Sequence, residues 1–485
     1  MTKEKPFIHL FNTQKGYYIF DVNTNAILKI NRGTYDLLKK ITSSQAISEE
    51  LYKSYCEDET IKNLKDNGFL SSKKVKEVVH PYNNILEYYM SRNIKMITLQ
   101  VTQQCNLRCE YCAYSGIYAN REHKNVKMSL ETAKKGIRFL LENSIDTEEV
   151  NIGFYGGEPL LEFELVKQAI LYAKSISEGK KLTFSFTTNG TLFTKEIIEF
   201  MMAQDVMITI SLDGPKEVHD KNRRFAVSGC GTFDKVIKNL DFFKKNYPEY
   251  FKKIIFNAVF DGSNNFNCLN EFFTTYDVIK DCAISTSEVA KEYALFDKSN
   301  NEDYDAQLDY EIFKMYLSKL NRVNERNVSK LVLEYYNNLE KSLVKERKLR
   351  TQLSDKDHHG GPCIPGAQRL FMDVNGNFYP CERVSENSEP MCIGNIDKGF
   401  DYDKIRRLLN IGELTKESCV NCWAFRFCTL CAAYADNLDE LSKKKKNSNC
   451  NFVRASLDKD LKDYCMLNEF GYRFSDDSAF ELVEV

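Results

Sequence analysis

Between residues 95 and 290, short apolar runs alternate with stretches that repeat apolar side chains every three or four positions. The first pattern is typical of buried strands, and the second, seen at 130–141 and 233–243, is typical of helices that cover a sheet. Strands that alternate with helices form parallel sheets, so we expect an α/β domain, a partial barrel of six β-α units. The strands are expected at 96–101, 150–155, 182–187, 206–212, 254–260 and 282–287.

The first 75 residues follow a different pattern. Three short apolar runs separated by turn residues predict a three-stranded meander. Three stretches with helical spacing follow and end at Asn67-Gly68, a helix-stop signal. Together they predict a small winged-helix-like domain. It could be a plain cap on the larger body or a DNA-binding module, but the acidic residues at 57–59 in its third helix would repel phosphate.

Two polar segments connect the predicted domains. A linker at 76–94 precedes the barrel, and a charged segment at 291–355 follows it. Apolar side chains recur with a helical period in the second segment, which predicts surface helices packed across the barrel mouth. These helices could also line a substrate groove.

Composition narrows the class of protein. A chain of 485 residues is too long for one ordinary core, so two or three domains are expected. The net charge of −2 gives no bulk attraction to nucleic acid or membrane, and the four lysines at 443–446 are typical of a solvated loop. The sequence shows no long apolar run and no signal peptide, so we expect a cytoplasmic protein. In that compartment, 16 cysteines indicate metal or redox chemistry rather than disulfides.

Three of these cysteines follow the first predicted barrel strand. Cys105, Cys109 and Cys112 are spaced C-x3-C-x2-C on one short loop. Three thiolates can hold a [4Fe-4S] cluster by three corners and leave one iron open to bind something else. The alternatives are a zinc knuckle or buried core thiols.

The next three predicted strands also end in polar, glycine-containing loops. The loop sequences are Gly156-Gly157-Glu158-Pro159, Thr188-Asn189-Gly190-Thr191 and Ser211-Leu212-Asp213-Gly214-Pro215, with Arg223 farther along. Any one of them could be an ordinary turn. In parallel α/β folds, however, the chemistry gathers at the carboxyl ends of the strands.

In this order the motifs resemble those of the radical SAM superfamily. The resemblance implies that Cys105, Cys109 and Cys112 hold a [4Fe-4S] cluster whose open iron binds S-adenosylmethionine (SAM). It also implies that the protein positions the cofactor while the cofactor supplies the radical. By the same resemblance the residues that bind SAM are Tyr111, Gly156, Gly157, Glu158, Asn189, Ser211 and Arg223.

A second group of cysteines occupies the predicted C-terminal domain, 356–485. Its members are Cys363, Cys381, Cys419, Cys422, Cys428, Cys431 and Cys450. Two zinc sites are an alternative, but seven ligands do not divide into two closed sites of four, and histidine is missing from the array. Iron-sulfur clusters suit an odd number, because four thiolates close one cluster and three leave another open.

This array resembles the SPASM domain of radical SAM enzymes, which implies two auxiliary [4Fe-4S] clusters and three in all. Two of the family's ligand groups are implied here: Cys419, Cys422, Cys428 and Cys450 for an outer cluster, and Cys363, Cys381 and Cys431 for an inner one. The spacing before Cys431 is one residue shorter than the family pattern. Cys392 could be an eighth ligand, although an isolated cysteine is most often a small buried hydrophobe, a description that also suits Cys56, Cys230, Cys268, Cys282 and Cys465.

The N-terminal domain resembles the peptide-recognition element of enzymes that modify ribosomally made peptides. In that family a leader peptide adds a strand to the sheet edge and packs on the third helix. The resemblance implies that the third strand and residues 60–65 of the third helix bind the leader. The strand residues are Ala26, Ile27, Leu28, Lys29 and Ile30.

Taken together, the motifs resemble those of ranthipeptide synthases, the thioether-forming maturases of cysteine-rich peptides. The resemblance implies a leader-bearing precursor peptide as substrate, an external electron donor, and cross-links from cysteine sulfur to carbon, plausibly the β-carbon of aspartate. The alternatives are a maturase that links cysteine to an α-carbon (a sactipeptide maturase), a sulfatase (formylglycine) maturase, and a non-catalytic iron-sulfur regulator that binds DNA. A regulator would not need the SAM motifs, so no nucleic-acid or membrane partner is expected, and the sequence does not identify a catalytic base.

Overall fold

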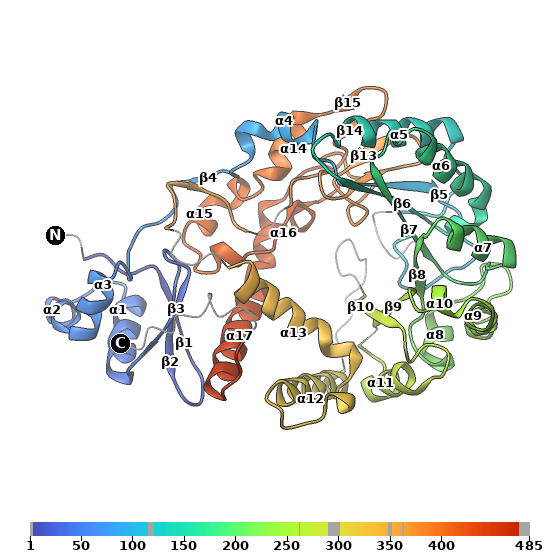
Figure 1. Cartoon of the computed structure of the whole chain (residues 1–485). Helices are drawn as coiled ribbons and strands as arrows, with labels where there is room; N and C mark the ends of the chain where they lie inside the picture. Colours follow the sequence, from blue (N-terminus) through green and yellow to red (C-terminus); the bar gives the residue numbers. More distant parts are fainter. Residues whose placement is uncertain are drawn as a thin grey trace.

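The computed structural model describes residues 3–114, 121–260, 262–289, 301–347, 352–360 and 363–474. The parts of the predicted segments that fall in the gaps, including 291–300 of the bridging segment and 475–485 of the C-terminal domain, lie outside the described residues. The described elements form an arc, with the barrel at one end and the N-terminal unit at the other (Figure 1).

The main sheet has ten strands in the order β10-β9-β8-β7-β6-β5-β12-β13-β14-β15. Its first six strands pair in parallel and form the predicted partial barrel. All six predicted strands are confirmed, with ends that differ by at most one residue. Their bounds are β5 Met96–Thr102, β6 Glu149–Gly156, β7 Lys181–Thr188, β8 Met207–Ser211, β9 Ile255–Phe260 and β10 Ala283–Glu288.

Helices cover the outer side of these strands (Figure 1). Their starts are encoded locally: for example, the side chain of Ser129 accepts a hydrogen bond from the backbone N–H of Thr132 and caps α5. Apolar residues at helical spacing, such as Ile137 and Leu140 in α5, are fully buried. The helices are α5 Leu130–Glu142, α6 Phe163–Ser175, α7 Lys195–Ala203, α8 Lys216–Asn222, α9 Phe233–Asn246, α10 Pro248–Phe251 and α11 Phe266–Thr275.

The N-terminal unit has the predicted three strands and three helices. Its strands form an antiparallel meander in the order β1-β2-β3, so that β3 is an edge strand. The helices cover one face of this sheet and α17 Cys450–Glu469 lies on the other side (Figure 1). The elements are β1 Ile8–Asn12, β2 Tyr17–Asp21, β3 Ala26–Ile30, α1 Arg32–Ser43, α2 Glu49–Glu57 and α3 Glu59–Asp66.

The C-terminal region extends the barrel sheet, which the sequence pattern does not predict. Strand β12 (Leu370–Met372) pairs in parallel with β5, aligning Phe371 with Thr98. Three short antiparallel strands then continue the sheet: β13 Asn377–Tyr379, β14 Gly394–Asn395 and β15 Gly399–Phe400. The loops between these strands therefore lie beside the cysteine loop that follows β5.

Helices complete the chain on either side of this sheet extension. In the bridging segment, α12 Glu302–Lys319 and α13 Leu333–Glu340 are described, and a short strand pair joins β4 Glu77–Val78 to β11 Lys356–Asp357. The remaining helices are α4 Leu86–Met90, α14 Tyr402–Leu409, α15 Lys416–Cys419 and α16 Lys443–Ser448, besides α17.

Two expectations about single residues are wrong. The four-lysine run is not a solvated loop, because it forms helix α16 and buries Lys446 almost completely. The lone thiols of Cys56, Cys230 and Cys268 are exposed, so only Cys282 and Cys465 among the five are buried hydrophobes.

Candidate radical and cluster sites

The cysteine loop is held from one side by the segment that follows α8. Leu107 forms a β-bridge with Phe225, and the backbone N–H of Arg108 donates to the carbonyl oxygen of Arg224 at 2.9 Å. The N–H of Ala226 donates to the carbonyl of Asn106 at the same distance. Main-chain bonds of this kind fix the loop without using the thiols.

The glycines of the loop after β6 hold the cysteine loop from the other side. A Cβ atom on Gly157 would stand 2.1 Å from the carbonyl oxygen of Gln104, and one on Gly156 would stand 2.0 Å from that of Thr102. The close approach allows the N–H of Gly157 to donate to Thr102 (3.0 Å) and that of Glu158 to donate to Gln104 (2.9 Å). Only glycine permits this contact.

The three thiols of the loop lie close together in a buried setting. Burial raises the pKa of Cys109 to about 12, and the neighbouring thiol of Cys112 reinforces the rise. Backbone N–H groups point at two sulfur atoms: Leu107 donates to Cys105 Sγ at 3.3 Å, and Tyr114 donates to Cys112 Sγ at 3.5 Å. Such donors favour thiolate, the form that binds iron, so this donor set fits a cluster.

Glu158 is buried and accepts three hydrogen bonds from the chain. Its Oε1 accepts from Thr188 Oγ1 (2.8 Å) and the N–H of Leu160 (3.0 Å), and its Oε2 accepts from the N–H of Asn189 (2.8 Å). Burial raises the pKa of Glu158 to about 7, although these donors oppose the rise. The carboxylate therefore ties the ends of β6 and β7 together, beside any contact it makes with a ligand.

Asn189 also links the end of β7 to the cysteine loop. Its Nδ2 donates to Asn106 Oδ1 at 2.8 Å and lies 3.9 Å from Cys105 Sγ. Ser211, the last residue of β8, is half-buried and aligned with Asn257 of β9. Five of the seven residues expected to bind SAM therefore lie at neighbouring strand ends around the three thiols.

The other two, Tyr111 and Arg223, face a residue to which the sequence assigned no role. Asp213 is fully buried and forms two hydrogen bonds with the guanidinium of Arg223, at 2.9 and 3.1 Å. The hydroxyl of Tyr111 donates to the same carboxylate. Burial opposes the charge of Arg223, but Asp213 and Tyr111 raise the pKa of this arginine well above its ordinary value. The Ser-Leu-Asp-Gly turn was a signal that could have identified Asp213.

A second buried ion pair, which the sequence motifs do not indicate, joins the segment after the cysteine loop to the loop after β13. Glu386, in the loop after β13, lies 2.7 Å from Nε of Arg121 and accepts from Gln100 Nε2 at 2.8 Å. The hydroxyl of Tyr114 donates to Glu386 at 3.3 Å, and Arg121 donates to the carbonyl of Glu382. These contacts connect the cysteine loop with the loop that carries Cys381.

Four C-terminal thiols gather between α15 and α17. Burial raises the pKa of Cys428 to about 11, and Cys419 and Cys422 are near enough to add to the rise. Burial also raises the pKa of Cys450, which Lys446 opposes and the same two thiols reinforce. The structure therefore brings together the four cysteines expected to bind the outer cluster.

Three further thiols form a separate group near β13. Burial raises the pKa of Cys381 to about 12, and Glu382, Cys431 and Cys363 contribute to the rise. Burial raises the pKa of Cys431, and the backbone N–H groups of Ala433 and Tyr434 oppose the rise. The Sγ of Cys392 donates to the carbonyl of Gly394 at 3.7 Å, and its role as an eighth ligand stays a prediction.

Within the described ranges, no three His, Cys, Asp or Glu side chains are arranged to hold a metal ion. The thiolates of a [4Fe-4S] cluster bind separate iron atoms at its corners, so they stand farther apart than the ligands of a single ion. Their role as ligands stays a prediction. In the same part of the chain, every helix is too short or too polar to span a membrane.

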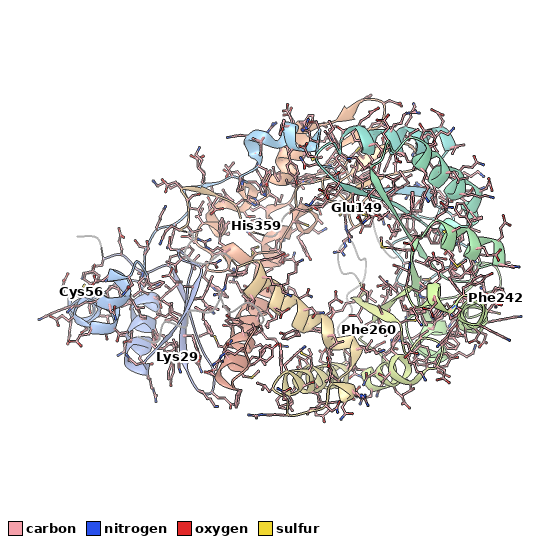
Figure 2. All side chains as sticks on the ribbon, viewed as in Figure 1. Lys29, Cys56, Glu149, Phe242, Phe260 and His359 are labelled. Carbon is pink, nitrogen blue, oxygen red and sulfur yellow. The ribbon has the colours of Figure 1, made fainter. Side chains whose placement is uncertain are left out.

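The edge strand expected to bind the leader belongs to a unit anchored on the C-terminal region. His9 of β1 stacks on Trp423 at 3.6 Å between ring centroids, and its Nε2 lies 2.8 Å from Asp458 of α17. Arg426 donates to the carbonyl oxygens of Val22 and Asn23. On the opposite side of the sheet from β1, the edge of β3 carries Lys29 (Figure 2).

The family comparison agrees with this geometry. Residues 99–265 match the model of the radical SAM superfamily, which is about a third of the chain and contains the cysteine loop, the glycine loop and Asp213. These residues form a radical SAM domain with a parallel α/β sheet at its core.

Two of the similar proteins have enzyme names. The radical SAM cyclopropyl synthase TigE of Paramaledivibacter caminithermalis is 26% identical to this chain. The match covers 51% of this chain and 56% of the length of TigE. A cysteine-type anaerobic sulfatase-maturating enzyme of Clostridium perfringens is 24% identical, over 69% of this chain and 87% of its own. This chain therefore aligns with little more than half of TigE.

Among solved structures, native anSMEcpe with bound AdoMet has a TM-score of 0.57 at 20% identity, covering 77% of this chain and 99% of that chain. A second structure of anSMEcpe, with AdoMet and the Cp18Cys peptide, has a TM-score of 0.56 at 19% identity with the same coverage. At these identities the likeness shows the fold alone.

Proposed function

We propose that this protein is a radical SAM enzyme that forms thioether cross-links in a leader-bearing, cysteine-rich precursor peptide. The observation that carries the radical chemistry is the meeting of three strand-end motifs around the loop that carries Cys105, Cys109 and Cys112. With SAM bound at its open iron, a reduced [4Fe-4S] cluster supplies the 5'-deoxyadenosyl radical.

The chain's own residues position the cofactor in this proposal. Glu158 and Asn189 present a carboxylate and an amide at the ends of β6 and β7, which suits the amino group and hydroxyls of SAM. Arg223 is already paired with Asp213, so we propose that it recognises the carboxylate of SAM with its remaining donors. Gly156 and Gly157 set the spacing between these groups and the cluster.

The two C-terminal thiol groups support auxiliary clusters. Cys419, Cys422, Cys428 and Cys450 would close an outer cluster, while Cys363, Cys381 and Cys431 would leave an iron of the inner cluster open. Forming a C–S bond from C–H and S–H removes two hydrogens. The adenosyl radical would take one of them as an atom, and the other would leave as a proton and an electron, with an auxiliary cluster as the electron acceptor.

The N-terminal unit supports a peptide as the substrate. Among the described strands, β3 lies at the edge of the meander beside β2, and Asn31, which follows it, donates to Thr60 of α3 at 3.2 Å. A leader strand added along 26–30 would pack beside that helix. The anchoring of this unit on Trp423 and α17 would hold the rest of the precursor near the cysteine-bearing loops.

The proposal is tested by anaerobic co-expression with a cysteine-rich peptide encoded beside the gene of this protein. Mass spectrometry should find the peptide lighter by two hydrogens per link, and fragmentation should place each link between a cysteine and an acceptor carbon. An unchanged peptide mass, with SAM cleavage intact, would contradict thioether formation while leaving the radical chemistry standing.

A sulfatase maturase is the second candidate, favoured by the similarity to the Clostridium perfringens enzyme over 69% of this chain. Such an enzyme converts a cysteine to formylglycine and needs no leader. Incubation with a cysteine-containing sulfatase peptide separates the two functions, because the aldehyde product reacts with a hydrazine probe and a thioether does not.

A further inference from the structure

Lys446 is a buried cation that lies close to a cysteine sulfur. It lies on α16 with 1% of its surface exposed. Its Nζ donates to Thr415 Oγ1 at 2.9 Å and lies 3.8 Å from Cys419 Sγ. Across the described ranges no carboxylate forms an ion pair with it, whereas Lys443 on the same helix pairs with Glu417 at the surface. Burying an ammonium without a counter-charge is costly, so this position calls for an anion.

Two other polar groups lie near the thiols expected to bind the outer cluster. Arg454 of α17 places a guanidinium nitrogen 4.0 Å from Cys422 Sγ. His359, near the centre of Figure 2, is 2% exposed, and its ring lies beside the backbone of Cys428. The charged side chain of Lys446 lies close enough to interact electrostatically with the His359 ring. Four thiolates with their iron and sulfide carry net negative charge, which matches this surplus of cations and donors.

The inner group of thiols has a different setting. Glu382 directly follows Cys381 in the chain. The carboxylate of Glu382 is paired with Arg369 at 2.6 Å, and the buried cation of Arg121 is paired with Glu386. Cations near the inner group are therefore balanced by carboxylates, while Lys446 in the outer group is balanced by sulfur.

We propose that Lys446, with help from Arg454, raises the reduction potential of the outer auxiliary cluster above that of the inner one. A positive charge and a hydrogen bond at a ligand sulfur stabilise the reduced, more negative state. Under limiting reductant, the outer cluster is therefore the one that takes up an electron first. This inference rests on the proposed ligand groups.

The test is an anaerobic dithionite titration of the reconstituted full chain, followed by electron paramagnetic resonance. In Lys446→Met, the ratio of reduced to oxidised outer cluster at a fixed potential should fall about tenfold, the low end of the range for hydrogen bonds to charged groups. The inner cluster should not change. Lys443→Met is the matched control, since this residue is 51% exposed on the same helix and should leave both clusters unchanged.

Iron content separates failure of this inference from failure of the ligand groups. If Lys446→Met keeps its iron and the ratio equals that of the wild type, the proposed role of Lys446 is wrong. If Lys446→Met loses the outer cluster, Lys446→Gln, which keeps a donor without the charge, replaces it and should give a ratio of reduced to oxidised cluster below that of the wild type. An unchanged ratio in that variant also contradicts the role. Full iron content in Cys419→Ala would instead contradict the ligand groups.

Discussion

Asp213→Asn should destabilise the protein far more than loss of a surface ion pair. Asp213 is fully buried, Arg223 is 8% exposed, and two hydrogen bonds of 2.9 and 3.1 Å join them. The carboxylate also accepts from Tyr111 and from the N–H of Val259 at 3.2 Å. Removing its charge leaves the guanidinium buried without a counter-ion, which costs about 3–5 kcal/mol.

The matched control is Asp205→Asn. Asp205 lies 2.7 Å from Lys253, but these side chains are 76% and 63% exposed. Solvent screens such a pair, so its loss should cost about 0–1 kcal/mol. Both values are measured by urea denaturation of the cluster-free protein, followed by circular dichroism. Equal losses of unfolding free energy in the two variants would refute the view that Asp213 is the structural counter-charge of Arg223.

Three further predictions test other parts of the site. Gly157→Ala should lose about 2–5 kcal/mol of stability together with cluster content, because its Cβ would meet the Gln104 carbonyl oxygen at 2.1 Å and break two hydrogen bonds of about 1 kcal/mol each. The control is Gly33→Ala, whose Cβ would have Asn31 Oδ1 as its nearest atom, at 3.3 Å. Normal iron content in Gly157→Ala would contradict the close contact. SAM binding, measured by equilibrium dialysis, should tighten roughly tenfold from pH 6 to pH 8, because Glu158 with its pKa raised to about 7 becomes ionised over that range, and Glu158→Gln should abolish this dependence. Ile27→Pro removes a backbone donor from β3 and should weaken leader-peptide binding, measured by fluorescence anisotropy, without changing iron content; unchanged affinity would show that β3 does not bind the leader.

The barrel could be predicted because its information is local. Each strand is a short apolar run, each helix repeats every three or four positions, and the motif loops follow the strands directly. Since parallel strands place their carboxyl ends on one edge, sequence order alone brings Glu158 and Asn189 to the cysteine loop.

Long-range pairing could not be predicted in the same way. The junction of β12 with β5 joins residues more than 270 positions apart through strands of three and seven residues, too short for β12 to stand out in the pattern. The ion pair of Arg121 with Glu386 depends on this junction. Neither residue belongs to a motif, so neither was a candidate.

Charge patterns misled where burial overrides them. Four successive lysines are normally solvated, yet Lys446 is buried while Lys443, on the same helix, stays at the surface. Asp213 was hidden for a related reason: in a turn sequence, an aspartate is usually explained by the turn itself. Both residues acquire meaning only from the partner that folding supplies.

The most direct test of the central claim is SAM cleavage by the anaerobically reconstituted, dithionite-reduced protein. Chromatography should detect 5'-deoxyadenosine with the wild type and with Cys268→Ala, an exposed lone cysteine on α11, and none with Cys109→Ala. Absence of 5'-deoxyadenosine from the wild-type reaction, or equal amounts from Cys109→Ala, would contradict a radical SAM site at this loop.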